Sequence, residues 1–315
     1  MTRLVIPKDL RWELIIVDNG IGHDTARVVA QYRGQLPLRR IEEPVPGLSH
    51  ARNRGVKEAI GDYICWTDDD VLVEPKWLAA YAEAFARHPE AAIFGGPIVP
   101  DLDPPTPHWF ASCQHCWPLT SVTAQRDLGD RVIALGQDGD RVPWGANFAV
   151  RSNEQKRFTY DPRLGLSPLQ HRIGEESDVI YRIMKKGGTG SWVPEAKVRH
   201  RIPTSRQTLG HILEYFRRVG ETAAYQHDVA PGDNWIEILS SPRFLHEGAV
   251  KRQVRTILFL QLFVAEWLRR RTCSALRHWA RFGLYLGLSS YHRRKLVNAS
   301  LNRPRTVRTE NGALS

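Results

Sequence analysis

The chain has 315 residues, of which 42% are hydrophobic, and it carries a formal net charge of +10. This length and composition allow a large core, in one domain or in a domain with an appendage. Its four cysteines are too few and too scattered for a disulfide framework, which predicts a reducing, cytoplasmic location. No apolar stretch is long enough for a signal peptide or for a confident membrane-spanning helix.

The positive charge is concentrated near the C-terminus. Residues 251–315 contain 14 Lys and Arg against 2 Asp and Glu, whereas residues 1–250 contain 30 against 32. A basic tail of this kind can attract nucleic acid or an anionic membrane surface.

Predicted strands and helices alternate along the first part of the chain. Short apolar runs predict strands, and apolar residues at helical spacing predict helices. In chain order we expect a strand at 13–17, helices at 25–33 and 49–60, a strand at 63–67, a helix at 74–88 and a strand at 91–99. This alternation is typical of a βαβ sheet with right-handed crossovers.

The second part of the chain is predicted to end in helices. Residues 100–140 are rich in Pro, Gly and polar residues and are expected to form loops. Further on we expect a strand at 142–150, a helix at 175–186, a strand pair within 191–200, and helices at 208–227, 254–268 and 276–288. The last two helices are apolar and rimmed with arginine.

Three consecutive aspartates, Asp68, Asp69 and Asp70, follow the apolar run Tyr63–Trp66. Carboxylates at the end of a buried strand are costly unless a positive group meets them, and a divalent metal is the usual partner. Asp18 also ends a predicted strand. Because ligands gather at the carboxyl ends of such strands, we expect these residues to face one site. A solvated acidic turn is the alternative.

Six sequence blocks occur in the order found in family 2 glycosyltransferases. They are ELIIVDN (13–19), PGLSHARNRG (46–55), GDYICWTDDDVLVEPKWL (61–78), WGANFAVR (144–151), GEESDVIYRI (174–183) and VPEAKVRH (193–200). The chain resembles this family over about residues 11–205. The resemblance implies an inverting enzyme with the Rossmann-like GT-A fold, a mostly parallel α/β sheet flanked by helices. We expect this domain at 1–205 and a basic helical extension at 206–315.

Two features depart from the family pattern. The family places a strand, a turn and a helix before the Asp18 strand, and too few residues precede Trp12 for that unit, so we expect it to be missing here. In the turn after Asp18, Ile21 replaces the usual Ser and His23 replaces the usual Asp.

The resemblance implies a donor site that uses Mg²⁺ or Mn²⁺. Asp70 would bind the metal directly, and Asp68 would contact the ribose or the waters of the metal, with Asp69 beside it. His200 would reach the metal or the diphosphate, although a lone histidine can equally be structural. The cation would neutralise the charge that develops on the departing nucleotide diphosphate.

The nucleotide is expected to contact the first predicted strand and helix 49–60. By resemblance, Asp18 would accept a hydrogen bond from the base; the alternative is an Asx turn that caps the strand end. Arg52 or Arg54 lies near the start of a helix, where phosphate is favoured, and we assign Arg54 to the donor site. Arg52 could instead lie on a solvated helix face.

An inverting transfer needs a base that deprotonates the acceptor hydroxyl. By resemblance to the family motif, Glu176 is the expected base. Glu175 is its acidic neighbour, which could instead contact the acceptor or the metal. The alternative for both is an acidic first helical turn that complements the helix dipole.

The block at 144–147 is expected to bind the acceptor. Gly145 permits close approach, and Asn147 offers both a donor and an acceptor to hydroxyl groups. Trp144 could stack on a sugar or lie in the core. Cys113 and Cys116 are spaced as half of a zinc site or as a redox pair, but neither interpretation has a supporting context.

The resemblance thus implies a metal-dependent transferase that moves sugar from a nucleotide-diphosphate donor, expected to be UDP-linked, to a glycan or lipid-linked acceptor in surface polysaccharide synthesis. The basic apolar tail suits peripheral contact with the inner face of an anionic membrane, or packing on the catalytic domain. No nucleic-acid partner is expected, because no recognised binding module accompanies the tail. The alternative functions are a non-catalytic GT-A-like scaffold and a nucleotidyltransferase.

Overall fold

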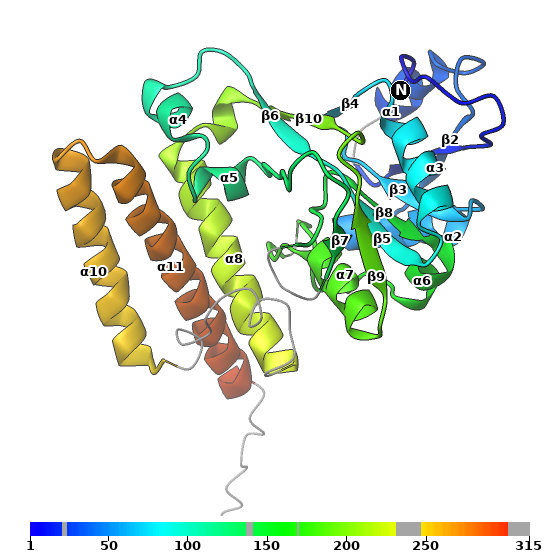
Figure 1. Ribbon diagram of the computed structural model, residues 1–315. Coiled ribbons are helices and arrows are strands. Elements are labelled where there is room, and N and C mark those ends of the chain that lie inside the picture. Colours follow the sequence, from blue (N-terminus) through cyan, green and yellow to red (C-terminus); the bar gives the residue numbers. More distant parts are fainter. Residues whose placement is uncertain (21–23, 137–140, 169, 231–246, 302–315) are drawn as a thin grey trace, which may run out of the picture.

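The computed structural model describes residues 1–20, 24–136, 141–168, 170–230 and 247–301 (Figure 1). Three β-sheets with surrounding helices form the N-terminal part, and long helices form the C-terminal part. The expected α/β architecture with a C-terminal helical region is confirmed. The departures at Ile21 and His23 lie outside the described residues.

The first sheet pairs β1 (Leu14–Asp18) with β2 (Leu38–Glu42) in parallel. Helices α1 (Asp24–Ala30) and α2 (Leu48–Glu58) follow the two strands. Gly55 lets α2 approach both this sheet and the next one. A Cβ at Gly55 would lie 3.5 Å from Val17 and 3.3 Å from Trp66. The carboxyl ends of two strands, one from each sheet, therefore lie against the same helix.

The central sheet has five strands in the order β3, β8, β5, β9, β7. Their bounds are β3 Tyr63–Trp66, β5 Ala91–Gly95, β7 Ala134–Leu135, β8 Phe148–Arg151 and β9 Thr189–Trp192. Only β5 and β9 pair in parallel within this sheet, as far as the described residues show. The sheet is therefore mixed rather than mostly parallel. Loops lead into β7 and β8, and an antiparallel neighbour needs no crossover helix.

Helices cover both faces of the central sheet. On one face, α7 (Glu175–Lys185) packs on Phe148 and Val150 of β8. On the other face, α3 (Trp77–Arg87) packs with Ala149 of the same strand. Successive side chains of β8 thus point to opposite faces, as the strand period requires. This double burial explains the continuous apolar runs of the strands.

The third sheet brings the acidic turn to a distant histidine. It consists of β4 (Val71–Val73), β10 (Val198–Ile202) and β6 (Ile98–Leu102), in that order. β4 and β10 are antiparallel, with His200 opposite Val71, and β10 and β6 are parallel. Because Asp70 directly precedes Val71, this register places His200 beside the acidic turn.

Residues 100–140 contain regular structure where loops were expected. Two short helices, α4 (His108–Cys113) and α5 (Leu119–Val122), lie in this region together with β7. The predicted strand at 91–99 is divided into β5 and β6, and the predicted strand at 142–150 forms only near its end, as β8. Helix α6 (Ser152–Arg157) follows β8 directly.

The C-terminal helices form a layer beside the sheets (Figure 1). They are α8 (Leu209–Val229), α10 (Ala249–Leu268) and α11 (Thr272–Leu301), preceded by the 3₁₀ turn η1 (Thr204–Arg206). Helix α11 packs on α8, and α10 packs on α11. The chain segments that the structure describes include no helix with the length and apolarity needed to cross a membrane.

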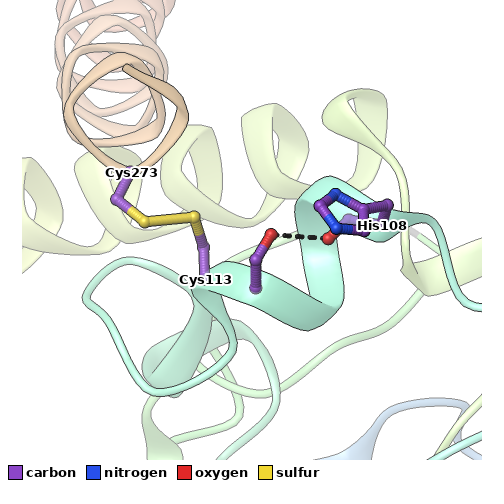
Figure 2. The surroundings of a disulfide bond; sticks show 4 residues. His108, Cys113 and Cys273 are labelled. Carbon is purple, nitrogen blue, oxygen red and sulfur yellow. Dashed lines mark hydrogen bonds between the residues drawn. A yellow bond between two sulfur atoms is a disulfide. The ribbon is translucent and has the colours of Figure 1, made fainter. Parts of the chain in front are cut away.

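The helical layer is attached to the rest of the chain by a shared core and a disulfide. Phe110 and Leu119 pack with Ile212, Phe216 and Leu276. Figure 2 shows that Cys113 of α4 is bonded to Cys273 at the start of α11. A division near residue 205 stays a proposal, since this contact lies across it.

The disulfide corrects one expectation from the sequence. The cysteines were judged too few and too scattered for a disulfide framework, which predicted a reducing compartment, yet Cys113 and Cys273 are joined across 160 residues of sequence. Cys116 is a free thiol, so the Cys113–Cys116 redox pair, which the sequence already left without support, is not formed. Folding sets this pairing, because no local spacing links positions so far apart.

Candidate active site

The acidic turn connects β3 to β4. Asp68 and Asp70 are partly buried, whereas Asp69 is exposed. The backbone N–H of Arg201 in β10 donates to the carbonyl oxygen of Asp70 at 2.9 Å. The turn is therefore held against β10, and Asp68 and Asp70 make the contacts that define the site.

The Asp70 carboxylate lies beside a histidine and an arginine. Its Oδ2 is 2.8 Å from Nη1 of Arg206 and 3.5 Å from Nε2 of His200. Burial acts to raise the pKa of Asp70, but the hydrogen bonds and charges of His200 and Arg206 outweigh it and lower this pKa. Asp70 is therefore a carboxylate at neutral pH.

His200 is buried and held by its second ring nitrogen. Nδ1 lies 2.9 Å from the carbonyl oxygen of Thr123, and because a carbonyl can only accept, Nδ1 donates. Nε2 is thus directed toward Asp70. Burial lowers the pKa of His200, but the bonds to Asp70 and Thr123 outweigh burial and raise it. Metal-binding histidines are commonly fixed by such a bond.

The residues at Asp70 fit a divalent cation as a partial ligand set. A carboxylate oxygen and an imidazole nitrogen are both accepted by Mn²⁺, and the carboxylate also suits Mg²⁺. No group of three or more His, Cys, Asp or Glu side chains among the described residues could hold a metal ion. Asp70 and His200 would therefore share the ion with oxygens of a substrate or of water, and Arg206 would have to release Asp70.

Arg52 is a buried cation between the acidic turn and α7. Its side chain is 5% exposed, with Nη2 3.4 Å from Oδ1 of Asp68 and Nε 3.5 Å from Oε1 of Glu175. The guanidinium also lies 5.4 to 5.6 Å from the ring centroids of Trp66, Phe148 and Tyr160. Arg52 therefore does not lie on a solvated helix face. Asp68, expected near the metal, is paired with this arginine.

Arg54 lies apart from this cluster. Its Nη2 is 3.0 Å from Oε1 of Glu58, one turn further along α2, and Glu58 also binds Arg39 of β2. The sequence placed Arg54 rather than Arg52 in the donor site. The structure favours the opposite order, because the helix turns Arg52 toward the acidic turn.

The two glutamates at the start of α7 differ in how far they are buried. It begins after Gly174, whose φ of 86° is left-handed and suits glycine. Glu175 is 3% exposed and faces Arg52. Burial and the charge of Glu176 raise the pKa of Glu175 well above its usual range, although Arg52 opposes this effect. Glu175 is too buried to touch an acceptor, so we reassign it as a positioning residue.

Glu176 is partly exposed and lies over Gly145. A Cβ at Gly145 would come within 2.9 Å of Cδ and Oε1 of Glu176. The expected close approach at Gly145 is thus made by the predicted base. The acceptor block and the base motif, separated by thirty residues of sequence, meet at one point.

Arg52 links Asp68 of the acidic turn to the start of α7. It contacts both Asp68 and Glu175, the residue before Glu176. Burial raises the pKa of Asp68, the Arg52 charge opposes this, and the negative charges of Asp70 and Glu176 add to the rise. The acidic turn and the base motif are therefore joined through Arg52.

Asp18, at the end of β1, is held by Arg40. Nη2 of Arg40 is 2.7 Å from Oδ2 of Asp18, and the Gly20 N–H donates to Oδ1 at 3.3 Å. Burial acts to raise the pKa of Asp18, but these partners outweigh it and lower the pKa. The Asx-turn bond is therefore present. Recognition of a base by Asp18 stays a proposal.

Asn147 does not contact an acceptor in this arrangement. The residue is fully buried, and its amide donates to the carbonyl oxygens of Pro97 and Ala196. Its Oδ1 accepts from Trp77 Nε1 and from Tyr81 Oη, each at 2.8 Å. All its hydrogen-bonding groups are occupied, so the predicted acceptor role is corrected to a structural one.

Trp144 combines the two alternatives considered for it. Its ring packs at the edge of the α3 cluster but stays partly exposed. The guanidinium of Arg126 lies 5.3 Å from the ring centroid. The ring face toward Arg126 is covered, and an acceptor contact through the remainder of the ring is a proposal.

Sequence reasoning missed Arg206 and underestimated Arg52. Arg206 follows His200 by six residues, and a basic residue shortly after the late histidine was the available signal. Arg52 and Arg54 both belong to the block at 46–55 that carries the resemblance, but only the packing of α2 decides which of the two is buried.

Comparisons with known proteins were made once this geometry was established. The family model described as glycosyl transferase family 2 matches residues 3–134. The chain is 25% identical over 219 residues to the succinoglycan biosynthesis protein ExoM of Rhizobium meliloti (strain 1021), covering 69% of this chain and 65% of that protein. It is also 25% identical over 194 residues to a glucosyl-dolichyl phosphate glucuronosyltransferase of Haloferax volcanii, covering 60% of this chain and 59% of that protein.

The chain therefore spans somewhat less than two thirds of the length of these relatives. Among solved structures, it is similar to a mannosyltransferase from Pyrobaculum calidifontis in complex with GDP-mannose and Mn²⁺. The TM-score is 0.56 at 17% identity, covering 91% of this chain and 79% of the other. This likeness shows the fold, and it agrees with the GT-A architecture expected from the sequence.

Proposed function

Because this chain belongs to glycosyl transferase family 2, we propose that it transfers a sugar from a nucleotide-diphosphate donor to a hydroxyl group of an acceptor, with inversion at the anomeric carbon. The observation that carries the proposal is the buried Arg52, which contacts both Asp68 of the acidic turn and Glu175, while the next residue, Glu176, lies against Gly145. A base and a donor-side carboxylate pair around one point are what this reaction requires.

Glu176 is the proposed general base. The residue is partly exposed, and its carboxyl group lies against Gly145. It would accept the proton of the acceptor hydroxyl as the oxygen attacks the anomeric carbon. Glu175 would help to position Glu176, because it connects the first turn of α7 to Arg52.

Asp70 and His200 would hold a divalent cation on the donor side. When bound, the cation would supply electrostatic stabilisation of the leaving diphosphate. Asp70 is kept ionised by its neighbours, and Nε2 of His200 is directed toward it. Arg206, which contacts both residues and is partly exposed, could contact the same phosphate groups once it leaves Asp70.

The donor and acceptor classes are also proposals. We propose a UDP-linked sugar as the donor, with Asp18 toward the base, and we include GDP-mannose among the donors to test because the structural neighbour binds it. A lipid-linked glycan is the proposed acceptor, which the name of the Haloferax relative supports. The name of the Rhizobium relative supports a role in polysaccharide synthesis. We further propose that the chain works at the surface of an anionic membrane.

A nucleotide-release assay tests the proposal. The protein is incubated with UDP- and GDP-linked sugars, with and without Mn²⁺ or Mg²⁺, and with candidate acceptors. We expect metal-dependent release by the wild type and loss of release by Asp70→Ala. If the wild type releases no more nucleotide than Asp70→Ala for any donor, the chain is a binding or scaffold protein instead.

A further inference from the structure

The outer face of α10 is apolar and has no partner in the chain segments that the structure describes. Helix α10 packs on α11 and lies at the edge of the molecule farthest from the sheets (Figure 1). Five apolar side chains, each 47 to 77% exposed, follow one another at helical spacing: Val250, Val254, Ile257, Val264 and Leu268. We call these five residues the outer stripe.

The outer stripe is free of charge along its whole length. Its members are separated by three, four or seven residues, which places them on one side of an α-helix. The remaining position on this side, residue 261, is a glutamine. The charged residues of α10 lie off this line. The stripe runs for roughly 27 Å along the helix at 1.5 Å per residue.

The surroundings of the stripe are cationic. Arg269, Arg270 and Arg271 are exposed at the end of α10. The two acidic residues of segment 247–301, Glu247 and Glu266, are both buried. Oε1 of Glu266 is 3.3 Å from Nη1 of Arg269, and Oε1 of Glu247 is 2.9 Å from Nε of Arg255. The exposed charge of this region is therefore positive.

We propose that the outer stripe of α10 docks this protein onto an anionic lipid surface, with the helix lying flat in the interface. An uncharged apolar face with exposed arginines at its end matches lipid chains below and phosphate headgroups beside them. Nucleic acid would match the arginines but would leave the stripe exposed to water. The disulfide between Cys113 and Cys273 ties the adjoining end of α11 to α4, so the docked helix would be held in a fixed orientation toward the catalytic part.

The test is binding of the purified full chain to phosphatidylcholine vesicles, with and without phosphatidylglycerol, measured by co-sedimentation. We expect binding that requires the anionic lipid and weakens with salt. Ile257→Glu places a charge in the middle of the stripe and should weaken binding roughly tenfold or more. Ile60→Glu is the matched control, since Ile60 is 85% exposed on the catalytic part, and it should bind as the wild type does.

A second variant tests the charge. Arg270→Gln should weaken binding to anionic vesicles about fivefold and leave any residual binding to neutral vesicles unchanged. Circular dichroism should show wild-type helix content in all variants. Equal binding of wild type and Ile257→Glu would overturn the proposal. A second result would also overturn it: wild-type protein that does not bind vesicles but forms a dimer, with Ile257→Glu remaining monomeric. A second copy of the chain would then cover the stripe. The assay contains no donor or acceptor, so its outcome does not depend on the transfer reaction.

Discussion

Gly145 and Glu176 are in direct contact, so that a single methyl group on Gly145 would come within 2.9 Å of the Glu176 carboxyl carbon. The carboxyl group of Glu176 lies at the end of a flexible side chain and can move away from such a methyl group. Its displacement would therefore cost little stability but would change the position of the proposed base.

The variant Gly145→Ala tests this contact. We expect kcat to fall about 100-fold, because a displacement of about 1 Å is enough for such a loss. The melting temperature should change little. Gly136→Ala is the matched control, since no atom of the described residues, its chain neighbours aside, lies within 4 Å of the added methyl group, and it should retain wild-type activity. Full activity of Gly145→Ala would show that the position of Glu176 is not critical.

Arg52 is expected to matter for stability as well as for the site. Arg52→Met leaves Glu175 and Asp68 without their buried cation, which should lower the free energy of unfolding by about 3 kcal/mol. Arg54→Met, on the same helix, removes a more exposed pair and should cost under about 1 kcal/mol. Urea unfolding measures both variants. A loss for Arg52→Met no larger than that for Arg54→Met would contradict the central role of Arg52.

The pH dependence of stability tests the state of Glu175. Its pKa is raised in the folded protein, so the folded state holds this proton more tightly than the unfolded state. Its contribution to stability therefore declines as pH rises from near 4.5, the usual value, through the folded pKa. Glu175→Gln, which stays neutral, should remove this decline when its unfolding free energy is compared with that of the wild type from pH 5 upward. Parallel pH curves for the two proteins would contradict the raised pKa.

The disulfide predicts which thiols react. Under non-reducing conditions, mass spectrometry of a digest should find the Cys113 and Cys273 peptides linked, with Cys116 open to alkylation. Cys273→Ala should lower the free energy of unfolding by about 2 to 4 kcal/mol, whereas Cys116→Ala should have a small effect. A link between Cys113 and Cys116, or a Cys113 that alkylates without reduction, would contradict the observed pairing.

Much of the architecture could be predicted from local patterns. The apolar runs located β1 and β3, and the apolar spacing located α2, α3, α7 and α8 to within a few residues. The order of the sequence blocks also brought Asp70 and His200 into one expected site, and the antiparallel register of β4 and β10 places them together.

The remaining features depend on contacts between distant segments. Arg52 and Arg54 have the same local sequence surroundings, and only the packing of α2 against Trp66 buries the first. Asn147 belongs to a block that suggests acceptor binding, but its amide closes a hydrogen-bond network among segments far apart in sequence. The pairing of Cys113 with Cys273 likewise follows from the meeting of α4 and α11. Sequence spacing carries no signal for such contacts.

The most direct test of this account compares Glu176→Gln with Glu175→Gln in the nucleotide-release assay with donor, metal and acceptor. Removing a general base lowers the rate by roughly 100-fold to 10,000-fold, so Glu176→Gln should lose transfer on that scale while it still binds the nucleotide. Glu175→Gln, altered at the buried neighbour, should retain most of the activity. Transfer by Glu176→Gln at the wild-type rate would contradict the assignment of this glutamate as the base.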